Sequence, residues 1–153
     1  MKKMLVAVAL LATLGVSSAL ELGVVGGGEW IRSSHDPVDS VGLTVGQHFG
    51  AFSATVEADR QSTTNVNKFD LIGGYDVATV SGVTVTAKAG VGYNQNPTIV
   101  DHANRYFGVV GAGLTVPVAK SVALTADYRY QSDRNTEKQF DGSTVLFGAK
   151  YSF

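Results

Sequence analysis

Hydrophobic and polar residues alternate along almost the whole chain from residue 20 onward, and no segment there shows the 3.6-residue period of an amphipathic helix. Because successive side chains of a strand point to opposite faces, this pattern predicts strands with one apolar and one polar face. Each expected strand is close to the ~9–11 residues that a tilted strand needs to cross a membrane. We predict strands at 21–31, 40–48, 51–60, 68–77, 82–93, 104–116, 121–131 and 143–153.

The expected connections alternate between long, polar loops and tight turns. The long loops follow the first, third, fifth and seventh strands, as at 60–67. The tight turns follow the second, fourth and sixth strands and lie near 49–50, 78–81 and 117–120. We expect Pro117 in the last of these turns, where its missing N–H does no harm. An even number of strands with long loops at one end and short turns at the other is the layout of a bacterial outer-membrane barrel.

One face of the expected sheet is apolar on every strand. Its residues are interrupted by four glycines and by Gln47, and we expect no charged residue among them. A charge at the bilayer midplane costs about 2–4 kcal/mol, so this face is expected to meet lipid. Its aromatic residues gather near the strand ends, which is typical of the belts at the two membrane interfaces. The expected girdle consists of Trp30, Phe69, Tyr93, Tyr106, Tyr128 and Tyr130 near the long loops and of Phe52, Tyr75 and Tyr151 near the short turns.

The opposite face carries charged and small polar residues among many glycines. Its charged residues are Glu29, Glu57, Asp59, Asp70, Asp76, Lys88, Arg105, Asp127, Arg129 and Lys150. If the apolar face meets lipid, these side chains point into the lumen, where eight strands leave just enough room for side chains. Isolated buried charges are costly, so we expect ion pairs that plug the barrel, with the glycines making room for them. The expected lumenal network consists of Glu57, Asp70, Lys88, Arg105, Asp127, Arg129 and Lys150.

The same alternation is compatible with two other arrangements. A soluble barrel would turn its apolar face inward around a ligand, as lipocalins do, but this arrangement does not explain aromatic belts at both rims. A narrow, porin-like channel would be lined by the same charged residues. Eight strands are too few for an open aqueous lumen, so we favour the plugged barrel.

The N-terminal segment predicts export. Two lysines precede an apolar run at 4–16 and small residues that end at Ala19, which is the order of a secretory signal peptide. We expect the signal peptide at 1–19, cleaved after about Ala19, and a single barrel domain at 20–153. The mature segment has ten basic residues against thirteen acidic ones, so no basic excess marks a nucleic-acid partner. The chain has no cysteine and three scattered histidines, and we expect neither a metal site nor a cofactor.

The last expected strand ends on Phe153, with Tyr151 on the same face. An aromatic ring beside the polar carboxy-terminus is expected where an apolar surface meets a wet boundary. This strand resembles the C-terminal signature strand of bacterial outer-membrane proteins. The resemblance implies that Tyr151 and Phe153 form an assembly signal, which the barrel-assembly machinery reads.

Taken together, these features resemble the small eight-stranded outer-membrane proteins of the OmpA transmembrane-domain, OmpX and opacity-protein type, over essentially all of residues 20–153. The resemblance implies an all-β, antiparallel, up-and-down transmembrane barrel in the outer membrane of a Gram-negative cell, in contact with lipid and lipopolysaccharide. It also implies a non-enzymatic, envelope-structural or surface-interaction role. The extracellular loops that would carry this role are expected near 32–39, 61–67, 94–103 and 132–142.

A lipid A-modifying enzyme is the alternative that the same architecture offers. Ser34, His35 and Asp36 are adjacent in the first long loop, and Asp101 and His102 are adjacent in the third. A histidine beside an acid and a hydroxyl is the chemistry of acyl transfer. A catalytic triad is a spatial arrangement, however, and Ser, Asp and His are ordinary loop residues. We therefore expect no catalytic residue.

Overall fold

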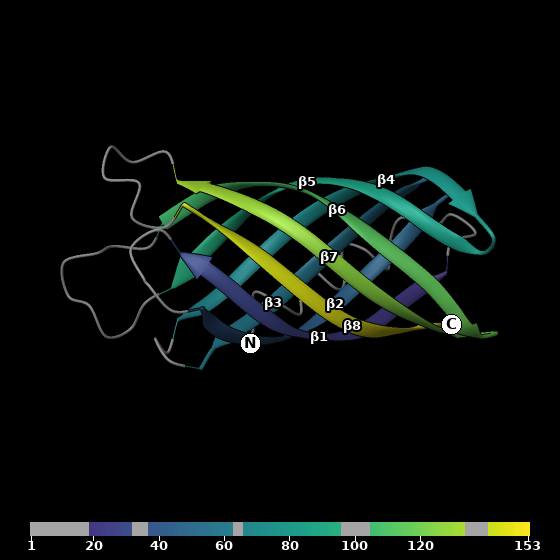
Figure 1. The fold of residues 1–153 in the computed structure, drawn as a ribbon, viewed down its shortest axis with the longest axis horizontal. Coiled ribbons are helices and arrows are strands. Elements are labelled where there is room, and N and C mark those ends of the chain that lie inside the picture. Colours follow the sequence, from purple (N-terminus) through teal and green to yellow (C-terminus); the bar gives the residue numbers. More distant parts are fainter. Residues whose placement is uncertain (1–18, 32–36, 63–65, 96–104, 134–140) are drawn as a thin grey trace.

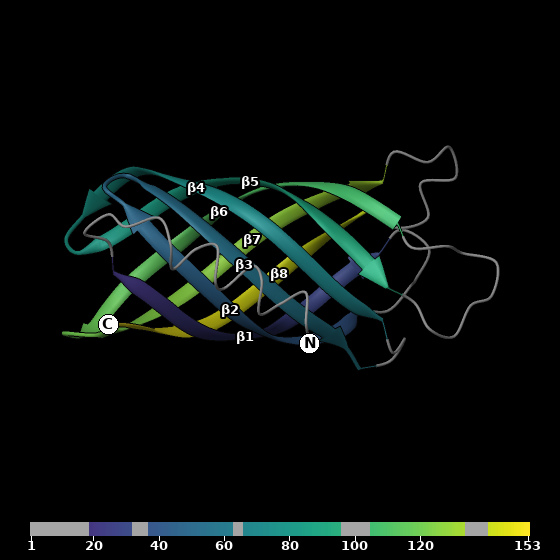
Figure 2. The ribbon, with the colours of Figure 1, turned by 180° about the vertical axis from the view of Figure 1, so that it is seen from behind.

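The computed structural model describes residues 19–31, 37–62, 66–95, 105–133 and 141–153. In these ranges eight strands form a closed antiparallel barrel, in which each strand pairs with its sequence neighbours and the last strand pairs with the first (Figure 1, Figure 2). The strands are β1 (Leu20–Ile31), β2 (Val38–Phe49), β3 (Phe52–Gln61), β4 (Asn67–Val80), β5 (Val83–Gln95), β6 (Arg105–Ala119), β7 (Val122–Asp133) and β8 (Gly142–Ser152). Among the described residues, no helix is long and apolar enough to span a membrane.

All eight expected strands are present, but β4 and β6 each continue three residues further than expected toward the short-turn end. A break in register accompanies each extension, between Asp76 and Ala78 in β4 and between Pro117 and Ala119 in β6. The placement of Pro117 in a turn was therefore wrong, because this proline lies in β6. A bulge leaves one residue unpaired, so a proline beside it is tolerated although it has no N–H for the ladder.

The turns between strands explain why one end of the barrel is compact. Ser81 and Gly82, which join β4 to β5, have φ values of 51° and 83°. Positive φ at both central residues matches a type I′ turn, whose twist suits a two-residue hairpin. Gly50, between β2 and β3, has a φ of 68°. These turns and the carboxy-terminus lie at the same end of the barrel (Figure 1).

Pairing between β1 and β8 closes the barrel. The two strands pair from Glu21 with Ser152 to Ile31 with Gly142, without a break in register. Beyond the last strand, the backbone N–H of Phe153 donates a hydrogen bond of 3.0 Å to the carbonyl of Leu20. The terminal aromatic residue thus lies at the closing seam, and its ring is 4.9 Å from that of Tyr151.

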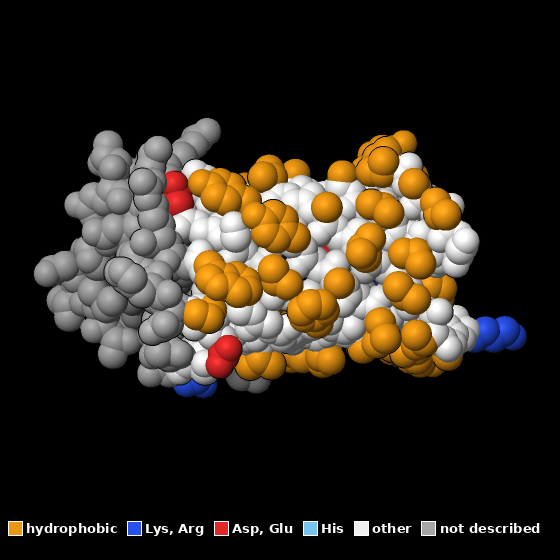
Figure 3. Space-filling model, viewed as in Figure 1, with side chains coloured by type: hydrophobic (Ala, Val, Ile, Leu, Met, Phe, Trp, Pro, Cys, Tyr) orange, Lys and Arg blue, Asp and Glu red, His pale blue; other side chains and the backbone are white. Residues whose placement is uncertain are grey.

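Hydrophobic side chains cover the outer wall of the barrel (Figure 3). Val41, Leu43 and Leu124 are 64%, 56% and 50% exposed, although each is a large apolar residue on a regular strand. This arrangement contradicts the soluble barrel, which would have buried them around a cavity. A continuous apolar exterior of this kind requires an apolar environment, and the hydrocarbon of a bilayer is such an environment.

The aromatic residues expected in the girdle point outward at the ends of the strands. Two ring pairs bridge neighbouring strands, Tyr93 with Tyr106 at 5.1 Å and Phe52 with Tyr75 at 5.0 Å between centroids. The first pair lies toward the long-loop end of β5 and β6, and the second toward the short-turn end of β3 and β4. The other girdle residues are exposed as well, namely Trp30, Phe69, Tyr128, Tyr130 and Tyr151.

The expectation that the outward face carries no charge was wrong at the long-loop rim. Asp39 of β2 and Arg60 of β3 lie on the outward parity and are exposed. Both are next to the end of their strand, where the alternation continues beyond the hydrocarbon. The cost of a charge falls to about 0–1 kcal/mol near the interface, which explains why these two are tolerated.

We predict that a charge at mid-height on the outer wall destabilises the folded barrel. Leu43 lies opposite Val24 on β1 and Ala58 on β3, so Leu43→Arg would place a guanidinium among apolar side chains. The expected loss in the free energy of unfolding is about 2–4 kcal/mol, measured by denaturant titration in lipid vesicles. Leu43→Ala is the matched control, since it shortens the side chain without adding charge. Equal losses in the two variants would contradict a lipid-facing Leu43.

Candidate functional site

Charged side chains from five strands converge inside the barrel because they share the inward parity of their strands. We call the following eight residues the lumenal charge network: Glu29 of β1, Glu57 and Asp59 of β3, Lys68 and Asp70 of β4, Lys88 of β5, and Asp127 and Arg129 of β7. All except Lys88 are buried. Such charges are stable only when they are paired and hydrogen-bonded.

The centre of the network is a two-pronged ion pair between Arg129 and Glu57. The two terminal nitrogens of Arg129 donate to the two carboxylate oxygens of Glu57, at 2.5 and 2.8 Å. The planar guanidinium matches a carboxylate in this geometry, and charge-assisted bonds of this kind are the strongest in proteins. Because β7 and β3 are four strands apart in an eight-stranded barrel, this pair crosses the lumen from wall to wall.

Asp127 connects this crossing pair to β5. Its carboxylate accepts a hydrogen bond of 3.2 Å from Arg129 and another from the ammonium group of Lys88. Lys88 is the more accessible cation, with 20% of its side chain exposed against 5% for Arg129. The exposed part of Lys88 faces a cavity in the short-turn half of the lumen.

A second layer lies toward the long-loop end. Glu29 accepts hydrogen bonds from the side-chain amides of Gln61, at 2.7 Å, and Gln131. Lys68 donates to the amide oxygen of Gln131 at 2.8 Å, and its nitrogen lies 3.8 Å from Glu29. The ammonium group is also 5.0 Å from the ring centroid of Phe107, within the range of a cation–π contact.

The lumen is not entirely polar, which the sequence analysis did not anticipate. Six apolar side chains of the inward parity are buried beside the charges, namely Val25, Val38, Ile72, Phe107, Val109 and Leu146. They exclude water from parts of the interior. Electrostatic interactions are stronger in such surroundings, and an unpaired charge there is more costly.

Inward-facing glycines provide the space that these side chains occupy. Gly111 lies between Lys88 and Arg129 in the register, and a β-carbon there would collide with the backbone of Tyr128 and press on the Arg129 side chain. A β-carbon at Gly92 would collide with the Phe107 ring. The outward-facing Gly108, by contrast, has no atom within 4 Å of this position. This agrees with the expectation that the inward glycines make room for long side chains.

A cavity of about 360 Å³ occupies the short-turn half of the lumen. It reaches from Lys120 and Ser121 at the β6–β7 turn up to Glu57 and Arg129, and serine and threonine hydroxyls line much of its wall. Above it, the buried side chains of the crossing pair and of the second layer fill the section of the barrel that the structure describes. The cavity is therefore a vestibule that ends at mid-height rather than part of a continuous pore through the described residues.

A separate ion-pair group lies at the short-turn end. Lys150 of β8 contacts Glu21 of β1 at 3.0 Å, and His48 of β2 lies 3.4 Å from the same carboxylate. Ser152 also donates a hydrogen bond of 3.2 Å to Glu21. These residues line the vestibule, not the crossing layer.

The structure brings together five of the seven residues expected in the lumenal network, namely Glu57, Asp70, Lys88, Asp127 and Arg129. Lys150 belongs to the separate group with Glu21. Arg105 is the first residue of β6, and its side chain lies outside the described residues, as do His35 and His102 of the alternative enzymatic site.

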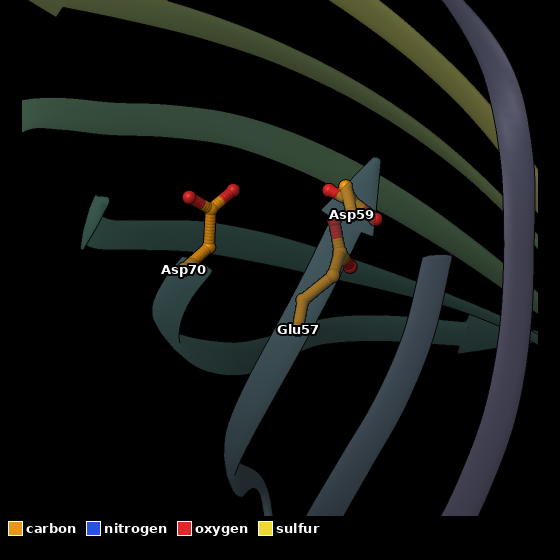
Figure 4. Close-up of side chains that lie close together, drawn as sticks. All are labelled: Glu57, Asp59 and Asp70. Carbon is orange, nitrogen blue, oxygen red and sulfur yellow. The ribbon is translucent and has the colours of Figure 1, made fainter. Parts of the chain in front are cut away.

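Sequence reasoning missed Lys68 and Glu21, although their parity was a sufficient signal. Lys68 shares the face of Asp70, two residues further along the same strand, and Glu21 shares that of Gly23. It also did not single out three carboxylates that come together in the wall. One oxygen each of Glu57, Asp59 and Asp70 lie within 4.8 Å of one another (Figure 4). We call these three residues the carboxylate triad.

Comparison with solved structures shows the same fold in small outer-membrane barrels. The N-terminal barrel domain of Pseudomonas aeruginosa OprF has a TM-score of 0.68 at 15% identity, covering 87% of this chain and 97% of that one. Neisserial surface protein A has a TM-score of 0.67 at 16% identity, with 90% and 98% covered. The attachment invasion locus protein Ail of Yersinia pestis has a TM-score of 0.63 at 14% identity, with 89% and 97% covered.

No protein-family model matches the chain, and no curated protein matches it in sequence. At identities this low, the likeness to solved structures concerns the fold alone. The fold is that of the eight-stranded transmembrane barrels of the outer membrane.

We predict that removing one partner of the crossing pair destabilises the barrel more than removing both. Arg129→Met leaves the Glu57 carboxylate buried without its main partner, at an expected cost of about 3–5 kcal/mol in the free energy of unfolding. The double variant Arg129→Met/Glu57→Met removes both charges and is expected to recover much of that loss. Denaturant titration in detergent micelles measures both values. Lys88→Met should cost less, since Asp127 keeps its contact with Arg129. Additive losses in the double variant would show that the two residues do not interact.

We predict that inward and outward glycines differ in their tolerance of a single methyl group. Gly111→Ala places a β-carbon against the backbone of the neighbouring strand, which has no freedom to move aside in a closed barrel. Gly108→Ala places it in open space on the outer wall of the same strand. We expect a lower yield of heat-resistant folded barrel for the first variant and little change for the second, measured by gel mobility of unheated samples. Equal folding yields would contradict close packing at Gly111.

Proposed function

We propose that this protein is exported to the outer membrane and acts there as a non-enzymatic barrel, in an envelope-structural or surface-interaction role through its extracellular loops. The observation that carries the proposal is the division of the described barrel into an apolar wall and a lumen blocked at mid-height. The wall is suited to lipid, and the side chains of the lumen are bonded to one another. The loops at the long-loop end remain as the part that contacts other molecules.

The names of two structural neighbours agree with a role at the cell surface. One is a surface protein, and the other is an attachment invasion locus protein. Barrels of this size present loops to the outside while their walls contact lipid and lipopolysaccharide. The proposal extends this arrangement to the segments near 32–39, 61–67, 94–103 and 132–142.

Two further steps belong to the same proposal. The segment at 1–19 directs export and is removed after about Ala19, because it has the charged, apolar and small-residue order of a signal peptide. The barrel-assembly machinery then recognises the last strand through Tyr151 and Phe153. Phe153 lies beside Leu20 at the closing seam, so the residues of the expected signal belong to the strand that closes the barrel, which supports this step.

The narrow channel is less well supported than the plugged barrel. The Arg129–Glu57 pair crosses the lumen, and a path for ions would require this pair to separate. Separation would leave two charges in a partly apolar interior, which is costly. The lipid A-modifying enzyme depends on loop residues such as His35 and His102, and adjacency in the sequence does not establish the spatial arrangement of a triad, so it is the weaker alternative.

We expect a strain that lacks this protein to differ from the wild type in envelope permeability or in surface binding, with an unchanged mass spectrum of lipid A. A variant in which the four long loops are replaced by short Gly/Asn turns should restore the permeability barrier but not surface binding, because it keeps only the barrel. The purified protein should give no steady conductance in planar bilayers. An altered lipid A spectrum would favour the enzyme, and a steady conductance would favour the channel.

A further inference from the structure

The lumenal charge network contains more acidic than basic groups. Five carboxylates, those of Glu29, Glu57, Asp59, Asp70 and Asp127, face the cations of Lys68, Lys88 and Arg129. Counting every member as ionised leaves two negative charges without compensation inside the described barrel. Uncompensated charges in a buried interior are strongly unfavourable, so the surplus is cancelled either by protons or by positive charge from another source.

The surplus is concentrated in the carboxylate triad. Glu57 of β3 lies directly opposite Asp70 of β4 in the register, and Asp59 follows two residues later on the same face. Like charges directly opposite one another on paired strands repel. The three side chains nevertheless point to a common region, where one oxygen from each lies within 4.8 Å of the others (Figure 4).

Asp70 provides a second observation, because it is buried without a hydrogen-bond donor. Its side chain is 0% exposed, and neither carboxylate oxygen accepts a hydrogen bond from a described residue. The nearest cations, Lys68 and Arg129, lie 3.7 and 3.8 Å away and make their short contacts with Gln131 and Glu57 instead. One carboxylate oxygen of Asp59 is likewise buried without a hydrogen-bond partner. A buried acceptor of this kind in a folded protein points to a partner other than the chain itself.

We propose that the carboxylate triad binds one divalent metal cation. Calcium and magnesium ions prefer carboxylate oxygens, and Glu57, Asp59 and Asp70 offer such oxygens from two adjacent strands. The two charges of the ion equal the surplus of the network. The wall leaves space for this arrangement, since β-carbons at Gly42 and Gly92 would collide with the carboxylates of Asp59 and Asp70.

The vestibule brings solvent close to the site. It opens toward the short-turn end, and its lining ends at Glu57 and Arg129, whereas Asp59 and Asp70 are not among its lining residues. In the barrel orientation proposed above, this end faces the periplasm. The ion neutralises Asp59 and Asp70, which accept no hydrogen bond from Arg129 or Lys68, and it joins β3 and β4 from the inside.

Thermal unfolding of the folded barrel in non-ionic detergent tests this proposal. The protein should be refolded without lipopolysaccharide, which itself binds divalent cations. Calcium chloride or magnesium chloride is expected to raise the unfolding temperature relative to EDTA at the same ionic strength, and isothermal titration should show one saturable site. Asp70→Asn should abolish the shift, and Asp59→Asn should weaken it. Asp76→Asn is the matched control, since Asp76 bonds to Thr86 away from the triad and should leave the shift unchanged.

Two results would overturn the proposal. One is an unfolding temperature of the wild type that is the same in EDTA and in either cation. The other is a shift that persists in both triad variants, which would place the bound ion elsewhere, for example at carboxylates of the long loops. An unfolding temperature that depends on pH but not on these cations also counts against it, because protons would then cancel the surplus. The wild-type measurement remains decisive even where a variant does not fold.

Discussion

Inside the hydrocarbon, a strand of a closed barrel can hold charges only on its inward face. The buried ion pairs of the described residues therefore meet in a lumen that is too narrow for water to hydrate them freely. Each must find its partner across or along the wall, and the bridge from Arg129 on β7 to Glu57 on β3 is the central contact. The position of nearly every other inward side chain can be understood from this crossing.

The glycines follow from the same constraint. An eight-stranded lumen cannot hold an arginine, two lysines and five carboxylates beside full-sized neighbours, so a glycine faces the long side chain at several positions. Gly111 accommodates Arg129, and Gly92 accommodates Phe107. In a strand of an ordinary sheet these glycines would be destabilising because they bury nothing. Here closure of the barrel restrains the backbone, and long inward-facing side chains occupy the space that the glycines leave.

The division of the barrel has consequences for function. In the proposed function, the wall anchors the barrel in lipid and the crossing layer stabilises it. The vestibule is different, because it brings solvent from the short-turn end to the edge of a network with an acidic surplus. The interior thus combines a sealed half with a half that solvent can reach.

The sequence alone determined the number of strands, their order, the direction of each face and the two aromatic ends, because all of these follow from a period of two and from loop length. It also placed Glu57, Lys88, Asp127 and Arg129 on the inner face. The parity of a residue does not show which charged residue on another strand it contacts, however. Which charges meet depends on the stagger between strands around the closed barrel, and this stagger brings Arg129 to Glu57 across the lumen and leaves Lys150 with Glu21 near the turns.

The tertiary structure also determined features that the alternation of apolar and polar residues does not predict. The bulges that carry β4 and β6 past their expected ends, with Pro117 inside a strand, depend on register with neighbours rather than on local residue preference. Glu57 and Asp70 lie opposite each other on paired strands, whereas the sequence pattern shows them only as two separate inward-facing charges. The residues of each strand determine which side chains share a face. Which charges neutralise one another in the lumen is determined only when the eight strands close into a barrel.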